Sequence, residues 1–268
     1  MQEARAGSLI EWLGGRTVAG YTYLANLGAL VVQAFHDLGA GGARGRREAF
    51  RVITRQILFT GVDALPVMSV ISLLLGIIVI TQAGTQLPLV GAEHLIGRII
   101  VVVVIRELGP LLTAFIVIGR SGTAITTELG NMRVAQEVTA LELMAIPVTR
   151  FIIMPRVVGM ILAMVCLTFY FDLVAVLGGF FIAKIELTIP FVAFADSILK
   201  TLSSVDVLVT AFKSALFGTI IASIGCYQGM AVGASPTEVP QQTTKAMINS
   251  VTVCLLADML IGFAAYLS

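Results

Sequence analysis

The chain has few charged residues, and this shortage already excludes an ordinary soluble protein. Only 12% of its 268 residues are Asp, Glu, Lys or Arg, whereas 57% are hydrophobic. Soluble domains carry roughly 25% charged residues, so about half of the usual water-facing charge is missing. The mean hydropathy of +0.97 agrees with this deficit. The composition therefore predicts an integral membrane protein, and we expect no nucleic-acid partner.

Residues that bind metals or perform catalysis are also scarce. The three cysteines, Cys166, Cys226 and Cys254, lie inside apolar stretches, and we expect small core residues rather than disulfide partners or metal ligands. His36 and His94 have no companion at metal-ligand spacing. We therefore predict no metal site and no cofactor. No Ser/His/Asp or Cys/His set supports catalysis.

A phosphate-binding loop is missing as well. The four lysines are Lys184, Lys200, Lys213 and Lys245, and none of them follows a glycine. The motif G-x-x-x-x-G-K-[ST] is therefore absent, and the chain cannot bind ATP in that way. If ATP drives its activity, another polypeptide supplies the ATPase, and this chain is not itself an enzyme.

Long apolar stretches predict an all-α integral membrane protein with five transmembrane helices. A spanning helix needs roughly 20 mostly apolar residues. The stretches that meet this length are about 62–83, 95–118, 151–182, 207–230 and 246–267. The third is long enough to be tilted or broken near Asp172, Gly178 and Gly179. Residues 184–206 have mixed character and predict a short extramembrane helix.

Residues 1–60 predict an interfacial region ahead of a five-helix transmembrane domain at 61–268. Three arginines, Arg47, Arg51 and Arg55, follow the spacing i, i+4, i+8, which places them on one face of a helix. Basic amphipathic helices of this kind lie at membrane surfaces with anionic headgroups. A plain solvated helix is the alternative. Residues 8–35 are less regular, and we interpret them as an interfacial or half-inserted helix.

The distribution of basic residues predicts the orientation. Eleven Lys and Arg residues lie before the first span, between the second and third, and between the fourth and fifth, whereas the other segments contain only Lys184 and Lys200. Basic residues in short loops stay in the cytoplasm. We therefore expect a cytoplasmic N-terminus and an external C-terminus, which fits an odd number of spans.

Arg106 and Glu107 stand side by side within the second apolar stretch. A charge near the middle of a bilayer costs at least a few kcal/mol, so such groups face protein, water or a bound polar group. Adjacent helical residues diverge, so these two do not pair well with each other. Pro110 also leaves the carbonyl of Arg106 without its helical partner. Either a polar patch near a phospholipid headgroup or an interhelical ion pair, within the chain or across a dimer, would explain the pair.

Other polar and small residues within the spans predict packing. We favour structural roles for Asp172 and Asp258, as caps or bridges between helices, although acids within membranes are functional candidates by default. In the fourth span small residues repeat every four positions, which permits close approach of helices. They are Ser214, Gly218 and Ala222, followed by Gly225, Gly229 and Gly233.

The segment between the second and third spans predicts a short amphipathic helix across the cytoplasmic mouth. Val134, Val138 and Leu141 recur at helical spacing. Glu128 and Glu142 are fourteen residues apart, so they lie nearly in line on a continuous helix. Such a helix either docks a soluble partner or only seals the bilayer surface, and the pattern alone does not separate the two.

An ordered run of motifs resembles the MlaE (YrbE-type) permease family, the membrane subunits of ABC lipid transporters that work with MCE proteins. The likeness covers about 60–268. The motifs are Arg106-Glu107-Leu108-Gly109-Pro110, Gly119-Arg120-Ser121-Gly122, Glu128 to Val134, Leu141-Glu142-Leu143-Met144 and Pro155-Arg156, with a weaker likeness from Thr243 to Asp258.

The resemblance implies a fold, partners and a location. It implies five spans preceded by an interfacial helix, in the bacterial inner membrane with a periplasmic C-terminus. It also implies a second copy of the chain, a cytoplasmic ABC ATPase subunit, a periplasmic MCE-domain protein and phospholipid as substrate. It does not decide whether a small cytoplasmic accessory subunit is also present.

The resemblance also assigns roles to residues. The segment about 128–145 resembles the coupling helix that sits in the ATPase groove. Its expected contact residues are Glu128, Met132, Arg133, Glu137, Leu141 and Glu142. The expected lipid cavity is lined by Arg106, Glu107, Leu87 and Val79.

Two other classes of function compete with a lipid permease. A proton-coupled secondary transporter of lipid or solute would use Glu107, Asp172 and Asp258 as a relay, but such carriers commonly contain internal repeats and this chain shows none. A membrane-embedded enzyme would use Glu107 as acid or base.

Overall fold

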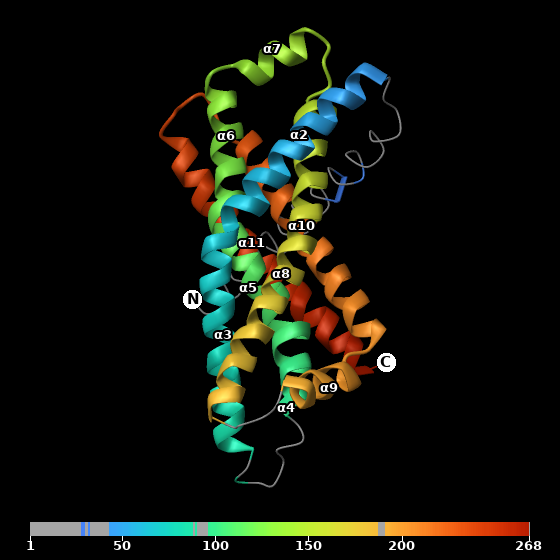
Figure 1. The fold of residues 1–268 in the computed structure, drawn as a ribbon. Helices are drawn as coiled ribbons and strands as arrows, with labels where there is room; N and C mark the ends of the chain where they lie inside the picture. The colour runs from blue at the N-terminus through green and yellow to red at the C-terminus, as the bar shows by residue number, and fades with distance from the viewer. Residues whose placement is uncertain are drawn as a thin grey trace, which may run out of the picture.

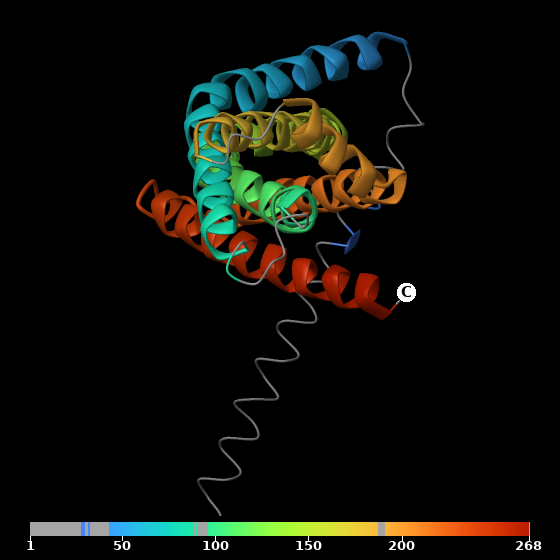
Figure 2. The same cartoon turned by 60° about the horizontal axis from the view of Figure 1, so that its bottom comes forward.

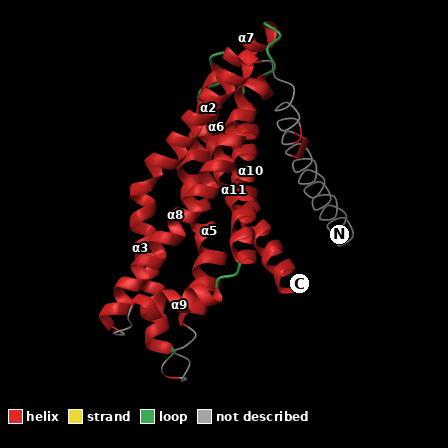
Figure 3. Cartoon of the chain, turned by 45° about the vertical axis from the view of Figure 1, so that its right-hand side comes forward, coloured by secondary structure: helices red, strands yellow, loops and turns green. Residues whose placement is uncertain are grey.

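The computed structural model describes residues 28–29, 32, 43–87, 89, 96–186 and 191–267. Within these residues the chain is helical and has no strand, and only short loops join the helices (Figure 3). Five helices are long and apolar enough to cross a membrane, which confirms the predicted all-α fold with five spans. They are Ile53–Gln86, Gly97–Val134, Thr149–Ile185, Ser204–Met230 and Glu238–Ala264. The helix expected at 8–35 lies outside the described residues apart from 28, 29 and 32.

The first span follows directly on the basic helix. Helix α2 (Ala43–Gly61) bends through a 3-10 turn, Val62–Ala64, into α3 (Leu65–Gln86), so the two lie at an angle (Figure 1). Arg51 and Arg55 are exposed on α2, whereas Gln56 is buried. The buried side packs against α8 (Met154–Glu186), where a Cβ at Gly159 would lie 2.8 Å from the Cβ of Gln56.

The second span is longer than a bilayer is thick. It contains 38 residues, or about 57 Å of helix, against roughly 30 Å of hydrocarbon. Its segments are α4 (Ile96–Ile99), a π-helical stretch Ile100–Leu108, α5 (Gly109–Val117), a second π-helical stretch Ile118–Gly122, and α6 (Thr123–Val134). Helix α7 (Glu137–Leu143) lies at one end of the molecule, and α4 and α9 (Phe191–Thr201) lie at the opposite end (Figure 1).

A turn at residues 135–136 interrupts the helix expected at about 128–145. Gln136 adopts a left-handed conformation with φ of 61°, and α7 begins only after it. Glu128 on α6 and Glu142 on α7 are therefore not in line on one helix, so that prediction was wrong. The sequence offered no warning, because left-handed turns usually carry glycine or asparagine.

The third span is not broken where its glycines occur. Helix α8 continues through Asp172, Gly178 and Gly179 without interruption. The two glycines instead allow α3 to approach closely: a Cβ at Gly178 would lie 2.7 Å from the Leu73 carbonyl oxygen, and one at Gly179 would lie 2.7 Å from Cγ1 of Ile80. Of the two alternatives, tilted or broken, the break is therefore wrong, and the glycines provide a packing contact instead. Helix α9 is a short helix within 184–206, where the sequence predicted one.

The core lies where α2, α3, α5 and α10 (Ser204–Met230) pack around α8, and α6 joins it through α10. Its fully buried side chains include Met160, Met164, Phe171 and Phe217. Close packing of α6 on α10 depends on the predicted small residues, since a Cβ at Gly229 would lie 2.7 Å from the Cβ of Leu129. Helices α2 and α11 (Glu238–Leu267) run along opposite outer edges of the bundle (Figure 2).

The cysteines are reduced, and two of the three lie in the core as expected. Cys226 and Cys254 are buried, but Cys166 is exposed on α8 and corrects the expectation for that residue. It lies within the third span, among residues that are apolar enough to face lipid. No cluster of potential metal ligands occurs among the described residues.

Candidate functional site

Lys213 joins the second, fourth and fifth spans through ion pairs. Its ammonium lies 2.8 Å from Oε2 of Glu107 and 2.7 Å from Oδ1 of Asp258 on α11. It also donates to the carbonyl oxygen of Arg106 at 3.2 Å. Only 1% of the Lys213 side chain is exposed, against 47% for Glu107 and 15% for Asp258. A buried ammonium is therefore surrounded by two carboxylates, and Glu107 connects this group to the surface.

Arg106 forms an ion pair at the N-terminus of α10, the helix that also carries Lys213. Its Nη2 lies 2.8 Å from Oδ1 of Asp206, a buried residue in the first turn of α10. The other oxygen of Asp206 accepts from the backbone N–H of Ser203 at 2.9 Å, and the hydroxyl of Ser203 accepts from the N–H of Val205. This capping box fixes the start of α10. The arginine is thus held by a carboxylate that already has a structural role, with 39% of its side chain still exposed.

The backbone around Pro110 explains how Lys213 reaches its position. Proline lacks an N–H, so the Arg106 carbonyl has no helical donor four residues later, and Lys213 fills that place. The residues before it form the π-helical stretch Ile100–Leu108. Stretches of this kind occur frequently at functional sites. Backbone and side chains of the second span therefore converge on one ammonium group.

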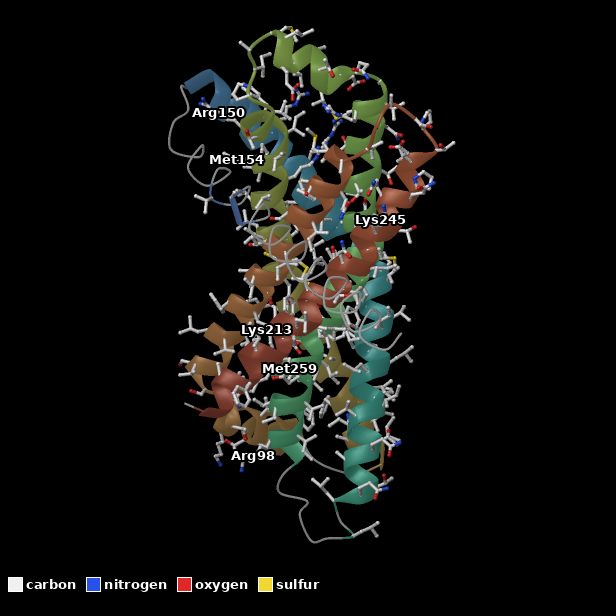
Figure 4. The ribbon with its side chains drawn as sticks, turned by 180° about the vertical axis from the view of Figure 1, so that it is seen from behind. Arg98, Arg150, Met154, Lys213, Lys245 and Met259 are labelled. Carbon is white, nitrogen blue, oxygen red and sulfur yellow. The ribbon has the colours of Figure 1, made fainter. Side chains whose placement is uncertain are left out.

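The ion-pair group formed by Lys213, Glu107 and Asp258 lies well inside the length of the bundle. Figure 4 shows Lys213 between the end that carries Arg150 and the end that carries Arg98, close to Met259, the neighbour of Asp258. Such a depth corresponds to the apolar portion of spans two, four and five. Charges at this depth are stabilised only by partners or water, and here partners within the same chain supply that stabilisation.

Two cavities flank the joint between α9 and α10. A polar one of about 430 Å³ is lined by Arg98, Val101, Val102, Arg106, Thr201, Ser203 and Asp206. An apolar one of about 400 Å³ lies on the other side of the same joint, with walls that include Ile105, Phe180, Phe194, Leu202 and Val207. Arg106 and Ile105 are neighbours in sequence, as are Ser203 and Leu202. A cavity lined by two arginines and an apolar cavity therefore lie at the same joint.

Asp172 also contributes to the lining of the apolar cavity, but it makes no bridge. Neither of its carboxylate oxygens has a hydrogen-bond partner among the described residues, and the side chain is buried. Its Oδ1 is pressed against the backbone of Gly109, where a methyl group would overlap it. The expected cap or bridge by Asp172 is absent from the described structure, whereas Asp258 does bridge α11 to α10 through Lys213.

The two apolar residues expected in the lipid cavity are packed against core clusters. Val79 on α3 is half-buried against the main core, which contains Phe171 and Ala175. Leu87 follows α3 and is half-buried against the second cluster, which includes Ile80 and Phe194. The second cluster also contains Ile105, the sequence neighbour of Arg106, whereas Val79 contributes to the packing of the main core.

The residues expected to contact an ATPase divide between two helices. Glu137 and Glu142 are exposed on α7, while Leu141 is half-buried against the core. Met132 and Arg133 lie near the end of α6 and are half-buried. Glu128 also lies on α6, and its Oε1 lies 2.8 Å from Nη2 of the buried Arg156 on α8. At the end of α7, Leu143 and the following Met144 expose 84% and 62% of their surface.

Sequence reasoning missed two residues of the ion-pair group. Asp206 fell in the mixed segment 184–206 and was interpreted as extramembrane, and Lys213 was considered only as a possible phosphate-loop lysine. A single lysine within the apolar run of span four was a usable signal, because intramembrane charges are rare. The partner of each charge could not be inferred from sequence.

Comparison with known proteins identifies relatives for almost the whole membrane domain. Residues 53–264 match the family model described as Permease MlaE. This interval contains all five apolar helices. A protein of Rickettsia prowazekii named as a probable ABC transporter permease is 34% identical over 210 residues, which cover 78% of this chain and 81% of that protein.

More distant relatives cover a similar region. The intermembrane phospholipid transport system permease protein MlaE of Haemophilus influenzae is 26% identical over 249 residues, which cover 89% of this chain and 95% of that protein. The chloroplastic protein TRIGALACTOSYLDIACYLGLYCEROL 1 of Arabidopsis thaliana is 27% identical over 213 residues, 80% of this chain and 61% of its own length. The similarity therefore extends across the spans that carry the ion pairs.

Proposed function

Because the chain belongs to the MlaE permease family, we propose that it is the permease subunit of an ATP-driven ABC transporter that moves phospholipid between the inner membrane and an MCE-domain partner. The observation that supports phospholipid as the substrate is the pair of cavities at the α9–α10 joint. One presents Arg98 and Arg106 against the single carboxylate of Asp206, and the other is lined by apolar side chains. A phospholipid has a phosphate and acyl chains, which match these two environments.

The ion pairs around Lys213 support a polar path within the membrane. Glu107 is half-exposed, yet it is bound to a fully buried ammonium. A second copy of the chain would cover this exposed side and complete a cavity at a dimer centre. Polar headgroups would then pass Glu107 and Arg106 without meeting bare hydrocarbon. Because Glu107 and Asp258 share one ammonium, their arrangement favours this function over a relay of free acids.

Helix α7 supports coupling to a separate ATPase. It lies at the end of the molecule to which the long second span extends (Figure 1), and it carries exposed acids beside the exposed Leu143 and Met144. Apolar side chains rimmed by charge are typical of docking surfaces. We infer from the excess of basic residues that this end faces the cytoplasm, and that the α9 end and the C-terminus face the periplasm, where an MCE-domain protein would bind.

The coupling proposal is tested by copurification of the ATPase subunit with the full chain. Charge reversal by Glu142→Lys or Arg133→Glu is expected to reduce the bound ATPase at least several-fold, because both residues lie at the proposed interface. Lys200→Glu on α9 is the matched control, since it reverses an exposed charge at the opposite end. Equal ATPase recovery in all three variants would argue against α7 as the coupling element.

The transport proposal is tested separately, by ATP-dependent transfer of labelled phospholipid in proteoliposomes that contain the whole complex. Glu107→Gln removes the charge while keeping the size of the side chain, so assembly is expected to persist and transfer to fall roughly tenfold, the effect of about one hydrogen bond to a charged group. Asp196→Asn on the exposed surface of α9 serves as the control. Transfer at the unmodified rate in the Glu107 variant would contradict a role for this residue in the lipid path.

A further inference from the structure

A third cavity with a different composition lies at the α7 end, beneath α2. It has a volume of about 550 Å³, within the usual range for ligand sites. Three elements line it: α2, α6 and the first turns of the third span. The lining residues are Arg55, Gln56, Phe59, Ala124, Ile125, Glu128, Met132, Phe151, Ile152 and Arg156. None of these residues takes part in the ion pairs around Lys213, so the cavity is separate from them, although Glu128 and Met132 are also among the residues expected to contact an ATPase.

The charges of this cavity are unbalanced. Two guanidinium groups, Arg55 and Arg156, face one carboxylate, Glu128. Arg156 is 92% buried along its side chain, and its Nη2 is held by Glu128 at 2.8 Å. Its Nη1 has no hydrogen-bond partner among the described residues. Buried donors without a partner are rare in native proteins and point to a bound water or ion.

The geometry around Arg156 leaves room for an anion. Glu128 is 62% exposed, so its carboxylate can turn toward water. Arg55 is exposed on α2 and approaches the cavity from the other side. A phosphate bound between the two arginines would supply the missing acceptor for Nη1. Guanidinium groups suit this ligand, because their planar donors match two phosphate oxygens at once.

The remaining walls favour a lipid as the source of the phosphate. Phe59, Ile125, Met132, Phe151 and Ile152 make most of the lining apolar. Phe59 and Phe151 are also 41% and 40% exposed, so the cavity opens onto an apolar surface. Helix α2 carries exposed arginines, which is typical of helices that lie on anionic membranes. A soluble phosphate compound would gain nothing from these walls.

We propose that the cavity formed by Arg55, Glu128 and Arg156 is a binding site for the phosphate group of an anionic phospholipid, taken from the leaflet on the α7 side of the membrane. The acyl chains lie over Phe59 and Phe151 toward the bilayer. The inference rests on the proposed function only in placing α2 at a membrane surface. Binding is measured without an ATPase and without transport, so failure here leaves the transport tests unaffected.

The experiment compares ligand affinity among variants of the purified full chain in detergent. The midpoint temperature of thermal unfolding is measured at increasing concentrations of one ligand at a time: short-chain phosphatidylglycerol, short-chain phosphatidylcholine or inorganic phosphate. Arg55→Gln removes one of the two guanidinium groups at an exposed position, so the fold is expected to persist. Arg51→Gln is the matched control, because Arg51 is an exposed arginine one turn away on α2 that does not line the cavity.

We expect phosphatidylglycerol to stabilise the unmodified chain more than phosphatidylcholine does. Arg55→Gln is expected to weaken the affinity for phosphatidylglycerol about tenfold, whereas Arg51→Gln changes it less than about twofold. Glu128→Gln is expected to tighten binding, since it removes the competing carboxylate, and Arg156→Lys to weaken it. Stabilisation by inorganic phosphate that disappears in Arg55→Gln would support the phosphate site and assign it to a free ion.

Two results would overturn the proposal. The first is an equal loss of affinity in the Arg55 and Arg51 variants, because binding would then depend on general positive charge along α2. The second is equal affinity for the two lipids together with no effect of inorganic phosphate, because the cavity would then not select an anionic phosphate group.

Discussion

At the scale of single residues, Lys213 determines how the charged positions of the spans are arranged. Its ammonium contacts Glu107, Asp258 and the carbonyl oxygen of Arg106. An unpaired ammonium at this depth would be strongly disfavoured. The two carboxylates and the backbone oxygen remove that penalty, and in turn the lysine fixes the rotation of spans two and five relative to span four.

Replacement of this lysine is expected to destabilise the protein. Lys213→Met keeps the length of the side chain but leaves Glu107 and Asp258 without a cation, and loss of one partner of a buried ion pair costs about 3–5 kcal/mol. Because Glu107 is half-exposed, we expect the lower part of that range. The measurement is thermal unfolding of the purified chain in detergent.

A second substitution separates charge from packing in this experiment. Asp258→Asn added to Lys213→Met removes one unpaired carboxylate and is expected to recover part of the lost stability. Lys200→Met, at an exposed lysine of α9, should change little. The change in stability caused by Asp258→Asn is measured in the unmodified chain and in Lys213→Met. If the change is the same in both backgrounds, the two residues are not coupled.

At the scale of helices, close contacts with α8 and α10 decide how the spans pack. The backbone of α10 approaches α6 at Gly229, which contacts Leu129 and the carbonyl oxygen of Thr126. Small residues allow such contacts within membranes, where packing replaces the hydrophobic effect as the source of association. The same contact matters for function in our proposal, because α6 leads directly to α7.

Gly229→Ala is expected to loosen the α6–α10 contact. The new methyl group would lie 2.7 Å from Leu129 Cβ and 3.0 Å from the Thr126 oxygen, and overpacking of this kind typically costs 1–3 kcal/mol. Gly119→Ala is the control, since a Cβ there meets nothing within 4 Å. Both variants are compared by thermal unfolding. A similar shift for both would mean that the α6–α10 distance adjusts freely.

At the scale of the whole molecule, the bundle is longer than a membrane is thick and its two ends differ. One end carries α7 and the other carries α9 (Figure 1). The cavity with Arg55 and Arg156 lies at the first end, and the cavity with Arg98 lies at the second. The proposed orientation places the first in the cytoplasm. In our proposal the ATPase and the MCE-domain protein would bind at opposite ends of the chain.

Labelling of introduced cysteines in spheroplasts tests this orientation. Cys166→Ser provides the background, because Cys166 is an exposed thiol. Lys200→Cys on α9 is expected to react with a membrane-impermeant maleimide in intact spheroplasts, whereas Glu142→Cys on α7 should react only after lysis. The opposite pattern would mean that α7 faces the periplasm and would rule out its contact with a cytoplasmic ATPase.

The sequence alone determined the properties that depend on local composition. The five spans follow from the length and apolarity of continuous stretches, because each helix satisfies its own backbone within the membrane. The orientation prediction likewise uses only the basic residues of the loops. The ordered motifs around Arg106 and Glu107 indicated the family, which the match over residues 53–264 confirms.

Only the tertiary structure decided which charged residues meet. Glu107 and Lys213 are 106 positions apart, and their contact depends on the rotation of two helices about their axes, which no local pattern encodes. The left-handed turn at Gln136 was equally invisible, since glutamine rarely adopts it. Glu128 was expected to align with Glu142, but it forms an ion pair with the buried Arg156 on α8 instead. Composition therefore determines that the chain crosses the membrane five times, while side-chain geometry between distant helices determines where its polar sites lie.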